Sequence, residues 1–184
     1  MINIKPLFVD LDGTLIKQDL SHEAFFYFLK KNPIACLGHL FIFLFLGRPY
    51  LKAKVSKFFK LESCELNFNQ ACINYIRTAI HNNRQVYLIS GSHQKLVDQI
   101  NAKLKLFHKV FGTHQNFNMV GKNKVKYINE ELQIFDFDYI GNSSQDLPIW
   151  QYTKKAIFTN LSPKIKNKLL TIDIELEEVL ADFK

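Results

Sequence analysis

Residues 8–15 are Phe8-Val9-Asp10-Leu11-Asp12-Gly13-Thr14-Leu15, and this stretch decides the fold of the 184-residue chain. Its apolar start runs into acidic and glycine residues, which is typical of a buried strand whose carboxyl end opens into a loop. The same pattern returns at residues 86–92, Val-Tyr-Leu-Ile-Ser-Gly-Ser, and at residues 137–143, Phe-Asp-Tyr-Ile-Gly-Asn-Ser. Because a helical segment follows each unit, the repeat predicts an α/β fold, a Rossmann-like three-layer sandwich with a mostly parallel sheet.

The segment between the first two units lacks the strand pattern and is predicted to be helical. In an open parallel sheet the ligand lies beyond the carboxyl ends of the strands, so a helical insertion after the first strand would lie over that site. We therefore predict a catalytic core of residues 1–16 and 84–184 and a cap of residues 17–83 that shields the reaction from water. The predicted cap helices are 23–31, 34–46, 51–59 and 69–82, and further core strands are predicted at 109–112 and 156–159.

Composition indicates a globular protein and excludes several classes. Hydrophobic residues make up 47% of the chain and charged residues 22%, which is too apolar for a disordered protein. The formal net charge of +7 favours anionic partners such as phosphorylated metabolites, nucleic acid or an acidic membrane surface. Three cysteines without the spacing of a zinc site, and a start without a signal-peptide pattern, indicate free thiols and a cytoplasmic protein.

Asp10 and Asp12, at the end of the first strand, are the strongest candidates for chemistry. Two such carboxylates can place one oxygen as a nucleophile and another as a proton donor on the same reacting group. They also attract a hard cation, and Mg²⁺ is well suited to one or two carboxylates together with a substrate phosphate. An ordinary Asp-Gly turn is the alternative interpretation.

The DxDGT pattern of residues 10–14 resembles the first motif of the haloacid dehalogenase-like superfamily of phosphatases. The resemblance implies a helical cap of the C1 type, an aspartyl-phosphate intermediate and Mg²⁺ as the cofactor. It also implies that Asp10 is the nucleophile and that Asp12 is the general acid and base and a metal ligand through its backbone carbonyl. Thr14 would support the turn.

Two further motifs of the superfamily have counterparts later in the chain. Ser90 ends an apolar strand and would donate its hydroxyl to a phosphoryl oxygen, helped by the amide of Gly91 at a helix N-terminus. A simple helix N-cap is the alternative for this serine. The superfamily also uses a lysine near a helix start to neutralise the nucleophile and the phosphoryl group. The Gly-x-x-Lys spacing from Gly121 selects Lys124, and Lys122 is a competitor.

The fourth motif supplies metal ligands after another strand, and residues 141–146 occupy its place. The usual form has an aspartate where this chain has Asn142, whose carbonyl can coordinate Mg²⁺ but adds no charge. The resemblance implies a metal set of Asp10, Asp12, Asn142 and Asp146. Asp146 would bind the ion directly or through water, or orient the lysine, and a helix-start aspartate is the alternative.

A closer likeness is to the haloacid dehalogenase-like domains that precede prenyltransferase membrane domains of the UbiA type. In that group the asparagine form of the fourth motif is usual. The likeness implies a free-standing relative, because a region with several membrane spans is not seen in the sequence. It rests on Asp10 to Ile16 with Asp19, Leu20 and Glu23, on Lys31-Asn32-Pro33, Gly47-Arg48 and Leu51-Lys52-Ala53-Lys54, and on the stretch from Gly141 to Trp150.

The cap holds an apolar segment, residues 34–46, that is shorter than the ~20 residues of a membrane-spanning helix. The helix predicted after it carries four lysines around an apolar face: Lys52, Lys54, Lys57 and Lys60. Such a pair of helices is typical of proteins that lie on an anionic membrane surface. Packing within the cap, with a solvated lysine face, is the alternative.

The first functional hypothesis is a Mg²⁺-dependent phosphatase that hydrolyses a small or lipid-linked phosphomonoester. Asp10, Asp12, Ser90 and Lys124 would be catalytic, and Ser90, Gly91 and Lys124 would bind the phosphate. The alternative is a weakly active or inactive module that binds a membrane surface or a protein partner. A motif of a known nucleic-acid reader is not found, so no nucleic-acid partner is expected. The expected location is cytoplasmic, at the inner face of a membrane if the cap contacts lipid.

Overall fold

A six-stranded parallel sheet forms the centre of the molecule, with the first strand in its middle. The structure is a computed structural model that describes residues 5–114 and 117–183. The strand order is β3-β2-β1-β4-β5-β6, and Phe8 of β1 lies between Tyr87 of β2 and Tyr139 of β4. The strands are β1 Leu7–Val9, β2 Val86–His93, β3 Lys109–Thr113, β4 Asp138–Gly141, β5 Lys155–Phe158 and β6 Glu175–Glu178.

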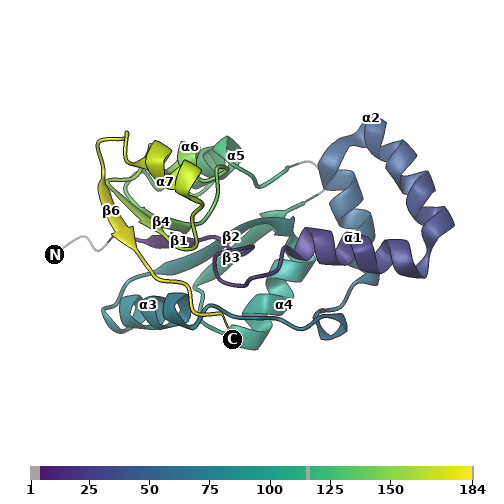
Figure 1. Ribbon diagram of the computed structural model, residues 1–184, viewed down its shortest axis with the longest axis horizontal. Coiled ribbons are helices and arrows are strands. Elements are labelled where there is room, and N and C mark those ends of the chain that lie inside the picture. Colours follow the sequence, from purple (N-terminus) through teal and green to yellow (C-terminus); the bar gives the residue numbers. More distant parts are fainter. Residues whose placement is uncertain (1–4, 115–116, 184) are drawn as a thin grey trace.

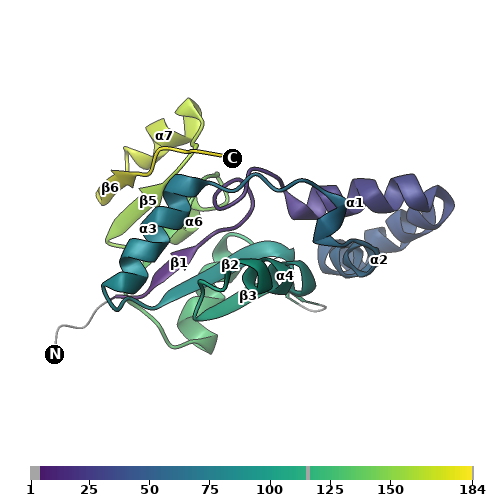
Figure 2. The ribbon, with the colours of Figure 1, turned by 90° about the horizontal axis from the view of Figure 1, so that it is seen from below.

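Helices cover both faces of the sheet, as Figures 1 and 2 show, and this confirms the predicted three-layer α/β fold. Successive strand residues point to opposite faces, so Val9 and Phe8 belong to different halves of the core. Val9 shares its half with apolar residues of α3 (Gln70–His81) and α4 (Gln94–Leu104). Phe8 shares the other half with apolar residues of α5 (Lys122–Lys126), the π-helical turn Tyr127–Glu131, α6 (Leu147–Trp150) and α7 (Pro163–Leu169).

The cap stands beyond one end of the sheet and is inserted between β1 and β2 (Figure 1). It contains α1 (Leu20–Lys31), α2 (Pro33–Phe58) and a short 3-10 turn, Leu61–Ser63. Asp19 caps α1, because its carboxylate accepts hydrogen bonds from the amides of Ser21 and His22. The two connections to the core run side by side: the Asn69 amide donates to the Leu15 carbonyl and the Lys17 amide to the Asn67 carbonyl.

α2 is interrupted at Gly47, whose φ of 74° lies in the left-handed region that glycine tolerates best. Its two halves correspond to the predicted helices 34–46 and 51–59, and the second half turns back toward the core (Figure 1). By length and composition, Pro33–Phe58 contains an 18-residue window apolar enough to cross a membrane, and the mean hydropathy of that window is 1.6. The break at Gly47 divides that length between two directions.

Two parts of the fold differ from what the sequence patterns suggest. α3, which the prediction places inside the cap segment 17–83, packs against the sheet through Ile73 and Ile76. The cap boundaries 17–83 stay a prediction. The two chain connections between the cap and the core pair with each other at Lys17 and Asn67. β6 was not predicted, because its Glu-Leu-Glu-Glu sequence resembles a loop. Lys155 of β5 pairs with Glu175 at 3.1 Å and Glu177 at 2.7 Å, which offsets this acidic edge.

Candidate active site

Asp10 lies where the central strand ends, and the chain then makes a tight turn. The Asp10 amide donates to the Ile140 carbonyl of β4, and the amides of Thr14 and Leu15 both donate to the Leu11 carbonyl. Gly13 has a φ of 76°, and a Cβ atom there would lie 2.1 Å from Nδ2 of Asn142. Only glycine fits this position, and the turn brings the DxDGT loop directly against the loop after β4.

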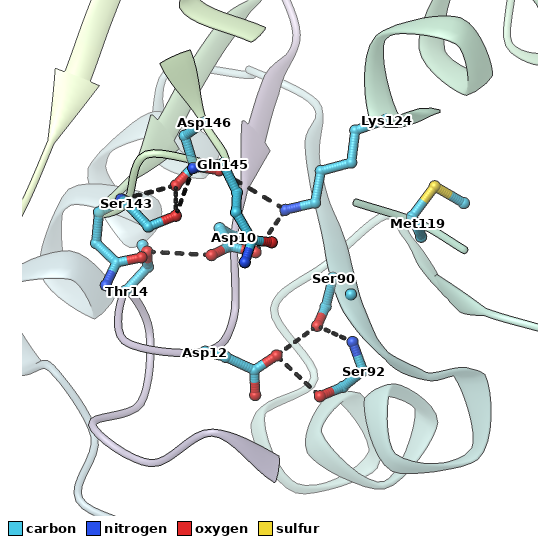
Figure 3. Close-up of polar contacts among 12 residues, drawn as sticks. Asp10, Asp12, Thr14, Ser90, Ser92, Met119, Lys124, Ser143, Gln145 and Asp146 are labelled. Atoms are coloured by element: carbon cyan, nitrogen blue, oxygen red, sulfur yellow. Dashed lines mark hydrogen bonds and ion pairs between the residues drawn. The ribbon is translucent and has the colours of Figure 1, made fainter. Parts of the chain in front are cut away.

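Lys124 is the cation that reaches Asp10. Its buried Nζ donates to Oδ1 of Asp10 at 2.6 Å and to the hydroxyl of Tyr139 at 2.7 Å, as Figure 3 shows for the Asp10 contact. Lys122 is exposed on the same short helix. Of the two lysines that the sequence left open, the structure brings Lys124 to the nucleophile candidate.

Asp12 is held by the end of β2. The hydroxyls of Ser90 and Ser92 each donate to Oδ2 of Asp12 at 2.8 Å (Figure 3), and the Leu20 amide donates to Oδ1 at 2.9 Å. Burial is the main cause that raises the pKa of Asp12, and these hydrogen bonds oppose the shift. Asp12 thus accepts a proton more readily than an ordinary aspartate.

The placement of Gly91 at a helix N-terminus is wrong. Gly91 lies inside β2, which continues to His93, and α4 starts only at Gln94 with His93 as its N-cap. The reason is that β2 resumes pairing with β3 at His93 and Thr113 after an irregularity, so the strand outlasts its apolar run. The N-cap alternative for Ser90 fails for the same reason, although Gly91 still lines the pocket.

Asp146 is buried, and its carboxylate is occupied by neighbouring groups. Oδ2 accepts hydrogen bonds from the amides of Asn142 and Ser143 and from the Ser143 hydroxyl, at 2.9–3.0 Å. Oδ1 accepts from the Tyr139 hydroxyl at 2.7 Å and lies 3.9 Å from Nζ of Lys124. Among the three predicted roles of Asp146, this geometry favours orientation of the lysine.

The oxygen donors near Asp10 fit a Mg²⁺ ion. Oδ1 of Asn142 is buried and has no hydrogen-bond partner in the parts of the chain that the structure describes. Asp10, Asp12 and Asn142 line one pocket. Within residues 5–114 and 117–183 no group of three acidic, histidine or cysteine side chains forms a metal site alone. Mg²⁺ commonly keeps several waters and takes one or two carboxylates together with substrate phosphate, so the oxygens of Asp10, Asp12 and Asn142 fit the protein's share of such a site.

Burial and three neighbouring charges set the pKa of Asp10. Burial raises the pKa of Asp10 to about 7, the Lys124 charge opposes this shift, and the charges of Asp146 and Asp12 add to it.

Burial also raises the pKa of the Tyr139 hydroxyl well above its usual range. Tyr139 therefore stays protonated and can donate to Asp146 while it accepts from Lys124.

The pocket above these residues has a volume of about 660 Å³, and the cap supplies much of its wall. Lys52 of α2 reaches into it, and its Nζ donates to the Gly91 carbonyl at 2.6 Å and to Oδ1 of Asn118 at 2.9 Å. The prediction that Lys52 belongs to an outward basic face is wrong, because the turn at Gly47 directs this side chain toward the core. Sequence reasoning missed Ser92 and Tyr139 as well.

The fold and the site together define a hydrolase-type α/β core: a carboxylate pair at the end of the central strand, a buried lysine beside it, and an inserted helical cap. The family model of the haloacid dehalogenase-like hydrolases matches residues 7–151. The chain belongs to this family.

One curated relative is the uncharacterized protein y4nM of Sinorhizobium fredii (strain NBRC 101917 / NGR234). It is 32% identical over 171 residues, which are 93% of this chain and 33% of that protein. The chain thus spans about a third of the length of this relative.

Two solved structures share the fold. A protein of unknown function from Bordetella pertussis Tohama I has a TM-score of 0.69 at 12% identity, covering 95% of this chain and 98% of that one. A substrate-bound phosphoserine phosphatase complex has a TM-score of 0.62 at 15% identity, covering 97% and 95%. Likeness at these identities concerns the fold, and it confirms the Rossmann-like core with a C1-type helical cap.

Proposed function

We propose that the protein is a Mg²⁺-dependent phosphatase that hydrolyses a phosphomonoester through an aspartyl-phosphate on Asp10. The observation that carries this proposal is the buried carboxylate of Asp10 at the end of the central strand, with Nζ of Lys124 at 2.6 Å. Asp12 lines the same pocket. The family match and the fold shared with a phosphoserine phosphatase support the same chemistry.

The residues divide the reaction into two steps. An oxygen of Asp10 bonds to phosphorus as the bond to the leaving oxygen breaks, and Asp12 donates a proton to that oxygen. Asp12 then takes a proton from water, the water oxygen bonds to phosphorus, and the bond to Asp10 breaks to release inorganic phosphate. Gly91 and Lys124 would hold the phosphoryl group during both steps, and the Ser90 hydroxyl would turn from Asp12 to a phosphoryl oxygen when the substrate binds.

Mg²⁺ would be held by Asp10, the backbone carbonyl of Asp12 and Oδ1 of Asn142, with Asp146 supporting the loop that carries Asn142. The bound ion would offset the negative charge that otherwise keeps a carboxylate away from a phosphate dianion. Hydrolysis of a panel of aryl, sugar, amino-acid, nucleotide and isoprenoid phosphates, with Mg²⁺ and with EDTA, tests the proposal. We expect Mg²⁺-dependent release of inorganic phosphate from at least the generic aryl phosphate.

Replacing Asn142 by aspartate should strengthen metal binding. The change adds a negative charge where a neutral oxygen has no partner in the described chain, so we expect half-maximal activity at an up to about tenfold lower Mg²⁺ concentration. Titration of activity with Mg²⁺ measures this. Asn129→Asp is the control, since the buried Oδ1 of Asn129 also lacks a partner among the described residues but Asn129 does not line the pocket. An unchanged Mg²⁺ dependence in Asn142→Asp would exclude position 142 from the metal site.

A weakly active or inactive module is the second candidate, and one observation favours it: the neutral Asn142 stands where the family commonly has a charged ligand. This candidate predicts negligible hydrolysis across the panel at every Mg²⁺ concentration. The Asn142→Asp variant separates the two proposals further, because a module that lost activity through its metal site should gain turnover.

We also propose that the cap contacts the inner face of a membrane. Its helices carry large apolar side chains that are 58–86% exposed: Phe26, Ile34, Leu37, Phe41, Leu44, Phe45 and Leu46. Exposed lysines lie nearby in the sequence, at Lys30, Lys31, Lys57 and Lys60. A second copy of this surface would bring like charges together, whereas an anionic bilayer complements them. The proposed partners are thus a phosphorylated small or lipid-linked substrate and an anionic membrane. The proposed location of the protein is the cytoplasm.

The double variant Leu44→Asp with Phe45→Asp tests the membrane proposal. We expect its binding to vesicles of phosphatidylcholine and phosphatidylglycerol to be at least about tenfold weaker in co-sedimentation, because charges replace two exposed apolar anchors. Phe135→Asp is the matched control, since Phe135 is also an exposed aromatic residue, at 68%, but belongs to the catalytic domain and not to the cap. Absence of wild-type binding, or equal losses in both variants, would contradict the proposal.

A further inference from the structure

The second half of α2 presents two cations to the pocket. Arg48 directly follows the break at Gly47, and Lys52 lies four residues on, so both side chains fall on one face of the helix. Both line the pocket that holds Asp10, Asp12 and Lys124. Two like charges one helical turn apart repel each other by a few tenths of a kcal/mol, so helix stability alone does not account for this pair.

Neither of these two residues forms an ion pair with a described residue. Lys124 is paired with Asp10 at 2.6 Å, but Lys52 donates only to two neutral acceptors, the Gly91 carbonyl and the Asn118 side chain. Arg48 makes no hydrogen bond or ion pair with any described residue. An ammonium group has a further N–H beyond the two that Lys52 uses, and the guanidinium of Arg48 has five.

The surroundings of Lys52 are partly buried and hold charges of both signs. Burial lowers the pKa of Lys52, and the charges of Arg48 and Lys124 act in the same direction, while Asp12 and Asp19 oppose them. An anion placed between Arg48 and Lys52 would relieve the repulsion between them. The phosphoryl group at Asp10 already has Lys124, Ser90 and Mg²⁺ in the proposed mechanism, so the cap cations exceed what that group needs.

We propose that Arg48 and Lys52 bind a second anionic group of the substrate. The substrate would then be a phosphomonoester that also carries a carboxylate or a second phosphate. This inference rests on the proposed phosphatase function and specifies its substrate class. Planar, bidentate contact from Arg48 and a point contact from Lys52 suit either anion.

Matched substrates test the inference. The substrate with an uncharged second group is carbamoylphenyl phosphate, called the neutral substrate below. The two-anion substrates are carboxyphenyl phosphate, whose second group is a carboxylate, and phenylene bisphosphate, whose second group is a phosphate. For the wild-type protein we expect kcat/KM to be at least about tenfold higher for one of the two-anion substrates, mainly through a lower KM. The ratio of kcat/KM for the two-anion substrate to kcat/KM for the neutral substrate should fall toward one in Arg48→Gln and in Lys52→Gln. Arg48→Lys should retain part of the preference for the two-anion substrate.

Lys57→Gln is the control variant, because Lys57 is an exposed lysine on the same half of α2 and does not line the pocket. It should leave the ratio unchanged. A wild-type enzyme that hydrolyses all three substrates equally would overturn the inference and leave the phosphatase proposal standing. Equal losses on the neutral and two-anion substrates in Arg48→Gln and Lys52→Gln would also overturn it, by assigning both cations to the transferred phosphoryl group. Failure to hydrolyse any substrate would instead refute the phosphatase function.

Discussion

Asp10→Asn should abolish Mg²⁺-dependent hydrolysis of an aryl phosphate, with kcat falling by on the order of 10⁴-fold or more. The amide keeps the shape of the carboxylate but lacks the charge and the nucleophilic oxygen that would bond to phosphorus. Lys124 keeps its contact with Tyr139 and its proximity to Asp146, so the buried network should hold. Initial rates and a thermal unfolding curve, measured on the same preparation, check both parts.

Asp138→Asn is the matched control for this experiment. Asp138 is also a buried aspartate on the sheet, but it pairs with Arg84 and does not line the pocket. Loss of that pair should lower the free energy of unfolding by about 3 kcal/mol and leave kcat at temperatures below the transition nearly unchanged. Full activity in Asp10→Asn would refute the mechanism, and a comparable loss of kcat in both variants would attribute the effect to the fold.

Lys124→Met should lower kcat/KM by about 10³-fold, because the variant loses the cation beside the nucleophile and the phosphoryl group. It should also unfold at a lower temperature, since Asp10 and Asp146 would then lie buried without their shared cation. Steady-state kinetics below the melting temperature measure the first effect separately from the second.

Lys122→Met is the internal comparison, because Lys122 is exposed two residues away on the same helix. We expect its kcat/KM to stay within about threefold of the wild-type value, since it loses only a solvated charge. A larger loss in Lys122→Met than in Lys124→Met would show that the motif spacing had been assigned to the wrong lysine.

The sheet and the motif residues were predictable from the sequence because both depend on where apolar strands end. β1, β2 and β4 are short apolar runs, and parallel strands bring their carboxyl ends to one edge. Asp10 and Asn142 directly follow β1 and β4, and Ser90 follows the apolar run of β2 although it still lies inside that strand, so the strand positions place all three near one edge of the sheet. The order of the family motifs then adds Lys124, although only the structure separates it from Lys122.

The rest of the site was missed because its signals are ambiguous at the level of sequence. Tyr139 lies within a buried strand and resembles an ordinary core aromatic, yet its hydroxyl links Lys124 to Asp146. Ser92 bonds to Asp12 because β2 continues past its apolar run, which alternation alone does not reveal. Lys52 belongs to a basic helix face by periodicity, and only the turn at Gly47 directs it into the pocket.

The covalent intermediate offers the most direct test of the central claim. The wild-type protein, mixed with an aryl phosphate and Mg²⁺, is quenched in acid within the first turnover, and its peptides are mapped by mass. We predict one added phosphoryl group on the peptide that contains Asp10, absent in Asp10→Asn and in samples with EDTA. Turnover with no phosphoryl group on that peptide at any quench time, or with the group on another residue, would contradict the assignment of Asp10 as the nucleophile.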